Sequence, residues 1–200
     1  MKPSRAAFTV AAGWLIASAP DGVAQNQRFT PTPMKKAAEL VKKQDDPVIN
    51  KKLADVINPD NAHVRVSLAR QRAFLMVGEE TYIDTPISSG KRAGMTPTGS
   101  FKVTEKDPDH RSSIYGNFVD KSGRVVRAGV SLKVDSAPSG TRYVGAPMKW
   151  FCRFNGAIGM HIGELPGYPA SHGCVRLPAE IAPLIYAKVK LGTPVEVTAE

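Results

Sequence analysis

Alternating apolar and polar residues run through most of the C-terminal two thirds of the chain. Val64, Val66 and Leu68 alternate with small or polar residues, as in a strand with one buried face. Further apolar runs bounded by Gly or Pro predict strands, at residues 73–77, 82–87, 100–103, 148–159 and 194–197. A chain made mostly of strands with few helices is typical of a sandwich or a barrel.

Three segments follow the helical period instead. Residues 33–57 predict two short amphipathic helices. The first begins at Pro33 after Thr32 as N-cap, and Asp46–Pro47 begins the second, because Pro suits the first turn of a helix. Residues 179–190 predict a third helix, and Gly192 is a typical C-terminal stop. We expect residues 25–61 to be a spacer that carries the first two helices, ahead of a β domain over residues 62–198.

The first residues resemble a targeting segment. Lys2 and Arg5 precede an apolar stretch over residues 6–19. Gly22 and Ala24 supply the small residues at positions −3 and −1 that are typical of a signal-peptidase cleavage site. We expect residues 1–24 to be a signal peptide, with an uncleaved anchor as the alternative. The mature protein is then exported to the periplasm or cell wall, without a transmembrane segment.

Composition is that of a globular protein with a basic surface. Of the 200 residues, 42% are hydrophobic and 22% are charged, and the formal net charge is +9. A positive excess favours an anionic partner such as a cell wall, a lipid surface or nucleic acid. Because the sequence carries no nucleic-acid-binding motif, nucleic acid is not expected.

The candidate chemistry is concentrated near the C-terminus. Residues 160–163 (MHIG) and 168–176 (YPASHGCVR) hold one of the two cysteines and two of the four histidines. A thiol beside an imidazole is the minimum equipment for cysteine nucleophilic catalysis. The alternative is a structural cysteine with two surface histidines. We interpret the other cysteine, Cys152, as a buried strand residue, and a regulatory disulfide with Cys174 stays open.

These motifs resemble the L,D-transpeptidase catalytic domain family (YkuD-like). In that family an upstream His precedes a Ser/Thr-His-Gly-Cys-x-Asn/Arg block, as His161 precedes residues 171–176 here. Residues 64–72 resemble its opening strand, residues 86–91 (PISSGK) its "P-x-S-x-G" segment, and residues 96–101 (TPTGSF) its "TPTGxF" turn. The resemblance runs in order from about residue 62 to 197 and implies a β-sandwich-like domain with the cysteine beside its strands.

The resemblance implies a role for each site residue. Cys174 is the nucleophile, and His161 is the base and later the acid. Gly163 permits close backbone approach, and a backbone carbonyl nearby can fix the imidazole tautomer.

The remaining motif residues have supporting roles. Ser171 is a loop hydrogen bonder, and Gly173 frees the turn so that backbone N–H groups face the oxyanion. His172 orients the loop or binds substrate. Arg176 either pairs with a substrate carboxylate or forms a structural salt bridge.

The implied substrate is a peptidoglycan tetrapeptide stem, cut between its third residue and D-Ala. The acceptor is a second stem, which gives a 3→3 crosslink, or a lysine of an envelope protein, or water, which gives a carboxypeptidase. No metal or organic cofactor is required. The family covers its site with the region that corresponds to residues 105–142, so we weigh a lid against a surface excursion there.

Other interpretations of the candidate site remain open. His161, His172 and Cys174 could form a three-ligand zinc centre, although no paired ligand motif accompanies them. A sortase-like enzyme also places His before Cys, but the histidine lies much further upstream. Papain-like enzymes place Cys first. A non-catalytic wall-binding module would not need both Cys174 and His161. The gap between these two residues is shorter than in many family members, which leaves acceptor specificity open.

Overall fold

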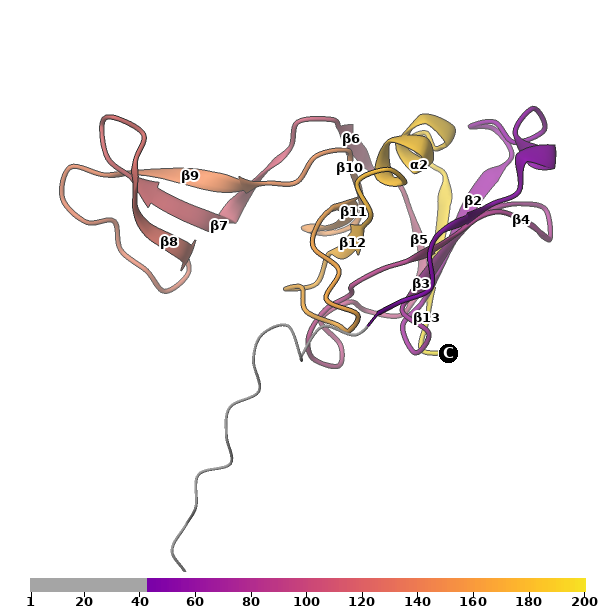
Figure 1. Cartoon of the computed structure of the whole chain (residues 1–200), viewed down its shortest axis with the longest axis horizontal. Coiled ribbons are helices and arrows are strands. Elements are labelled where there is room, and N and C mark those ends of the chain that lie inside the picture. Colours follow the sequence, from indigo (N-terminus) through magenta and orange to yellow (C-terminus); the bar gives the residue numbers. More distant parts are fainter. Residues whose placement is uncertain (1–42) are drawn as a thin grey trace, which may run out of the picture. The chain divides into compact units, whose positions relative to one another are not determined.

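The computed structural model describes residues 43–200 (Figure 1). Its order of elements is β1 (Val48–Ile49), η1 (Lys51–Leu53), β2 (Ala62–Ser67), β3 (Arg72–Val77), β4 (Glu80–Pro86), β5 (Gly99–Lys102), β6 (Glu105–Asp107), β7 (Arg111–Val119), β8 (Val125–Ser131), β9 (Arg142–Pro147), β10 (Phe151–Asn155), β11 (Ile158–Ile162), β12 (Val175–Leu177), α2 (Ala182–Lys188) and β13 (Pro194–Thr198). The predicted mainly β fold and the helix near residues 179–190 are confirmed. The predicted signal peptide and first helix lie outside the described residues.

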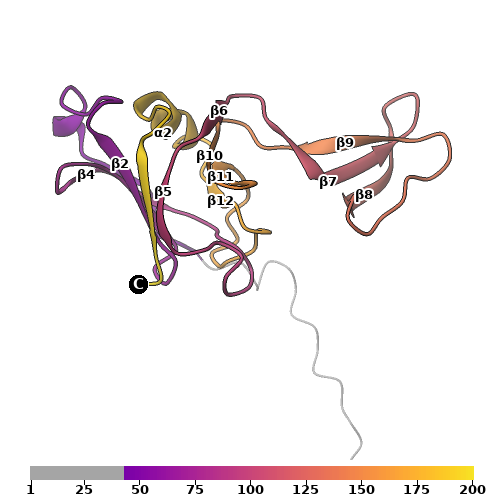
Figure 2. The same cartoon turned by 180° about the vertical axis from the view of Figure 1, so that it is seen from behind.

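Two sheets enclose the hydrophobic core. The larger has the strand order β1-β4-β3-β2-β13-β5, and the smaller has the order β12-β11-β10-β6. Figure 2 shows β2 and β4 of the larger sheet on one side of α2 and β10, β11 and β12 of the smaller sheet on the other. Val64, Leu75 and Val195 of the larger sheet and Met160 and Val175 of the smaller sheet all lie in this core. Apolar residues at every second position therefore face one another across the interior, as in a sandwich.

The second predicted helix, over residues 46–57, is wrong. Val48 and Ile49 pair with the outer edge of β4, opposite Asp84 and Ile83. A 3₁₀ turn follows, and within it the side chain of Asn50 accepts the N–H of Lys52. The β4 edge offers backbone partners that an isolated helix lacks, and this outweighs the helical period.

Residues 105–142 do not form a loop. They contribute β6, which pairs with β10, and most of a separate three-stranded sheet in the order β8-β7-β9. The chain leaves the smaller sheet after β6 and returns to it at β10. Among the described residues, no helix is long and apolar enough to cross a membrane.

Candidate active site

The smaller sheet presents one face to the core and the other to the candidate site. Cys152 of β10, Met160 of β11 and Val175 of β12 are buried in the core. Because side chains alternate along a strand, their neighbours point the other way. The site face therefore carries Phe151, Arg153, Gly159, His161, Cys174 and Arg176.

Strand register brings Cys174 and His161 together on this face. The parallel pairing of β11 with β12 sets Met160 opposite Val175 and His161 opposite Arg176. Extending this register by one residue towards the N-terminus sets Cys174 opposite Gly159 of β11. Cys174 is therefore a diagonal neighbour of His161, two residues further along β11 on the same face. Sγ of Cys174 lies 3.9 Å from the carbonyl oxygen of Ala157.

Burial raises the pKa of the Cys174 thiol. A hydrogen bond from the Gly159 backbone and the charges of Arg153 and Arg176 act in the opposite direction and lower this pKa, but burial is the largest cause. The resting side chain is therefore a neutral thiol at neutral pH.

The imidazole of His161 is buried and held by the backbone. Its Nδ1 lies 2.6 Å from the carbonyl oxygen of Ile162. A carbonyl oxygen only accepts, so Nδ1 carries the proton and the lone pair is on Nε2. This contact fits the predicted backbone support of the tautomer.

Burial is also the main reason that the pKa of His161 falls to about 4, and Arg176 and His110 lower it further. The hydrogen bond to Ile162 opposes this fall. Neutral imidazole beside neutral thiol is an arrangement for general-base attack rather than a preformed ion pair.

Ser171 and Gly173 shape the turn that carries Cys174. The Ser171 hydroxyl donates to the Cys174 carbonyl oxygen at 2.5 Å and accepts the Gly173 N–H at 3.0 Å. Gly173 has φ +134°, and a Cβ there would lie 2.8 Å from the Met95 carbonyl oxygen. The predicted conformational role of Gly173 fits this geometry. Its own N–H, however, is engaged by Ser171 and does not face a substrate.

A buried polar network holds this turn against the segment after β4. Gln71 bonds both the N–H and the hydroxyl of Ser89, at 3.0 and 2.8 Å. The Ser89 carbonyl oxygen accepts the N–H groups of Ala170 and Ser171, and the Lys91 N–H donates to the Ser171 carbonyl oxygen. Gln71 could not be recognised as a site residue from the sequence, because only the order of the motifs pointed to this region.

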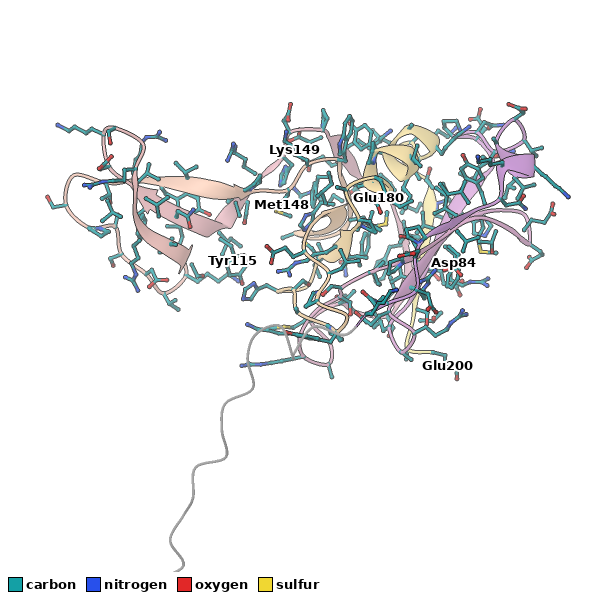
Figure 3. The ribbon with its side chains drawn as sticks, viewed as in Figure 1. Asp84, Tyr115, Met148, Lys149, Glu180 and Glu200 are labelled. Carbon is teal, nitrogen blue, oxygen red and sulfur yellow. The ribbon has the colours of Figure 1, made fainter. Side chains whose placement is uncertain are left out.

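His172 contacts Tyr115 and Lys91. Its ring stacks on Tyr115 of β7, with centroids 4.2 Å apart and 13° between planes. Tyr115 is labelled in Figure 3. Nε2 of His172 lies 3.2 Å from Nζ of Lys91. Burial, Lys91 and Arg176 lower the pKa of His172. This contact joins β7 to the turn that carries Cys174, and both a lid and a surface excursion stay open for residues 105–142.

Arg176 lies over Gly163. A Cβ on Gly163 would stand 2.7 Å from Cγ of Arg176, which explains why this position is a glycine. Nη1 of Arg176 lies 3.4 Å from the Glu164 carbonyl oxygen. Within residues 43–200, Arg176 forms no ion pair, and its pairing with a substrate carboxylate stays a prediction.

The alternative zinc centre is not assembled in the described region. The one group of His, Cys or acidic side chains found close enough to hold a metal in residues 43–200 is Glu105, Asp107 and His110. His161, His172 and Cys174 are not such a group. Cys152 and Cys174 are both free thiols.

The comparisons with known proteins agree with this geometry. A family model described as the L,D-transpeptidase catalytic domain (YkuD) matches residues 61–197. The chain belongs to this family. A comparison with curated proteins found no match.

Solved structures share the fold. An L,D-transpeptidase from Mycobacterium smegmatis is 19% identical, with a TM-score of 0.51 over 70% of this chain and 59% of the other. One from Xylanimonas cellulosilytica is 21% identical, with a TM-score of 0.51 over 70% and 61%. One from Enterococcus faecium is 21% identical, with a TM-score of 0.51 over 70% and 50%. The chain thus spans about three fifths or less of the length of these relatives.

Proposed function

We propose that this protein is an L,D-transpeptidase that acts on peptidoglycan stem peptides through a thioester at Cys174. The observation that carries the proposal is the His161–Ile162 contact, because it leaves Nε2 free as a base on the face that holds the thiol. Export to the periplasm or cell wall is part of this proposal, since the substrate is found there.

Cys174 and His161 together supply the proton transfers that each step of the acyl transfer needs. As Sγ attacks the carbonyl carbon between the third residue and D-Ala, Nε2 of His161 takes the thiol proton. The imidazolium then protonates the leaving amine, so that the tetrahedral intermediate collapses, D-Ala departs and the thioester remains. An incoming amine loses its proton to His161, forms the new amide and releases the thiol. Positioned N–H donors that stabilise the oxyanion contribute about 3 kcal/mol each in other enzymes.

The acceptor decides between the possible products. A stem-peptide amine gives a 3→3 crosslink, a lysine attaches an envelope protein, and water releases a tripeptide. All three share the same thioester, so the geometry of Cys174 and His161 serves each of them equally.

Mass spectrometry of the purified chain with defined tetrapeptide muropeptides tests the proposal, with Cys174→Ala as the control. Dimers that disappear in the variant are the expected result. Tripeptides without dimers would instead indicate hydrolysis or a protein acceptor. Absence of both the thioester and turnover would overturn the enzymatic function and favour a wall-binding module.

A further inference from the structure

Trp150 has a backbone conformation that side chains rarely adopt. In residues 43–200, only Gln71 and Trp150 are non-glycine residues with a positive φ, and that of Trp150 is +59°. This left-handed region is sterically crowded for L residues, and a bulky or β-branched residue there is an outlier. Trp150 lies directly before β10, where the chain returns from the β8-β7-β9 sheet to the smaller sheet. A bulky residue at a position suited to glycine indicates that this backbone geometry is required.

The peptide unit between Lys149 and Trp150 is hydrogen-bonded at both ends. The Trp150 N–H donates to the Pro108 carbonyl oxygen at 3.0 Å, and the Lys149 carbonyl oxygen accepts the Ile162 N–H at 3.0 Å. Lys149 is labelled in Figure 3. Because a peptide unit is planar, φ of Trp150 sets the orientation of both groups relative to β10. The positive φ therefore directs the Lys149 carbonyl towards β11.

Ile162 connects this peptide unit to His161, the proposed base. Its carbonyl oxygen lies 2.6 Å from Nδ1 of His161. The backbone of Ile162 is held on both sides, because its own N–H donates to Lys149 and the N–H of Gly163 donates to the Leu177 carbonyl oxygen at 3.1 Å. These two bonds fix the direction of the Ile162 carbonyl. If the Lys149 carbonyl turned away, only the bond of Gly163 would remain.

The ring of Trp150 has a separate role in packing. It lies edge-on to Tyr186 of α2, with ring centroids 5.2 Å apart and 65° between planes. It is half-buried and packs against the hydrophobic core. This packing explains why the position carries Trp although glycine would suit the backbone better. The ring contact can be removed at Tyr186 without changing the residue at position 150, so ring and backbone can be tested separately.

We infer that Trp150 is a positioning residue, whose left-handed backbone keeps His161 in the tautomer with its proton on Nδ1. It acts through the Lys149 carbonyl and Ile162. The inference rests on the proposed function, because His161 is the base there and Nε2 can take the thiol proton only in this tautomer. Burial lowers the pKa of His161 to about 4, and the bond to Ile162 opposes this fall. Loss of that bond would therefore also make the imidazole a weaker base.

Substitutions that differ in backbone preference at position 150 test this role. Trp150→Gly and Trp150→Asn remove the ring but accept a positive φ, whereas Trp150→Ala and Trp150→Val remove the ring and disfavour it, Val more strongly than Ala. Tyr186→Leu is the matched control, because it removes the ring contact and keeps Trp150. With a tetrapeptide donor, we expect kcat to fall about tenfold in Trp150→Ala and further in Trp150→Val, with KM unchanged. The Gly and Asn variants and the control should stay within about threefold of the wild type.

NMR of the imidazole nitrogens reads the tautomer directly, in a Cys174→Ala background where no turnover is needed. The signal of His161, assigned by its absence in His161→Gln, should keep its proton on Nδ1 in the Gly and Asn variants and move in part to Nε2 in the Ala and Val variants. An equal loss of kcat in all four variants would make Trp150 a packing residue and overturn the inference, as would an Nδ1 proton that is fully kept in Trp150→Val. Thermal melts show whether each variant folds, and the comparison of Gly with Ala decides if Trp150→Val does not. A wild type that acylates no stem peptide sinks the proposed function, whereas the NMR result still decides on Trp150.

Discussion

The hydroxyl of Thr96 donates to the Gly173 carbonyl oxygen at 2.7 Å and accepts the Gly90 N–H at 2.9 Å. One buried side chain thus joins the segment after β4 to the residue before Cys174. Thr96→Val removes both bonds and leaves two backbone groups without partners, at about 1–3 kcal/mol for each unsatisfied group. We expect a lower melting temperature and at least tenfold slower acylation.

Thr96→Ser is the matched control, because it keeps the hydroxyl and loses only a methyl group. It should acylate within about threefold of the wild type, since both hydrogen bonds can re-form. If Thr96→Val acylated as fast as Thr96→Ser, the hydroxyl would not position the catalytic turn.

The alkylation rate of Cys174 should report a neutral thiol. Burial raises the thiol pKa, so the thiolate fraction rises about tenfold per pH unit through neutrality. The rate of reaction with iodoacetamide should follow this rise without a plateau, once the contribution of Cys152 is removed with Cys152→Ala. A plateau between pH 5 and 8 would instead reveal a thiolate–imidazolium pair.

His172 should become easier to protonate when Tyr115 is removed. Burial is the first cause of its lowered pKa, and the Tyr115 ring covers one face of the imidazole. Tyr115→Ala should therefore raise the His172 pKa towards its ordinary value, and Tyr115→Phe, which keeps the stack, should not. NMR titration of the imidazole measures both, and an unchanged pKa in Tyr115→Ala would show that the β8-β7-β9 sheet does not cover the turn in solution.

Gly163→Ala should act on substrate binding through Arg176. The new Cβ would meet Cγ and Cδ of Arg176 at 2.7 and 2.8 Å, so the arginine must move. We expect Gly163→Ala and Arg176→Ala to lower kcat/KM for the tetrapeptide donor by similar factors, about tenfold for a lost charge-assisted bond. Because both changes act on one contact, the double variant should be little worse than either alone.

The sequence predicted the parts of the fold in which local pattern and tertiary contact agree. Val64 and Val66 alternate and are buried in β2, and Ile181 and Ile185 carry the apolar face of the C-terminal helix into the core. Ile49 lies at a position with helical periodicity, but it pairs with the open edge of β4. This pairing could not be predicted from the periodicity, because the edge forms only when β4 pairs with β3.

The same reasoning applies to the site. Cys174 and His161 were identified from a local motif and a resemblance, and the strand register brings them to one face. Gln71 lacked such a cue, since it acts through Ser89, which is distant in the sequence. For Thr96, the resemblance of residues 96–101 to the family's turn was the only signal that it belongs beside Cys174.

Cys152 and Cys174 lie on opposite faces of the smaller sheet, on strands separated by β11. A disulfide needs Cα atoms within about 7 Å, so the folded chain cannot join them. An unfolded chain has no such barrier, and only 21 residues separate the two cysteines in sequence. In oxidising surroundings, folding therefore competes with formation of a Cys152–Cys174 disulfide. A chain that forms this disulfide before it folds cannot reach the native structure. Replacing Cys152 with Ala should raise the refolding yield under air while leaving the yield under reductant unchanged.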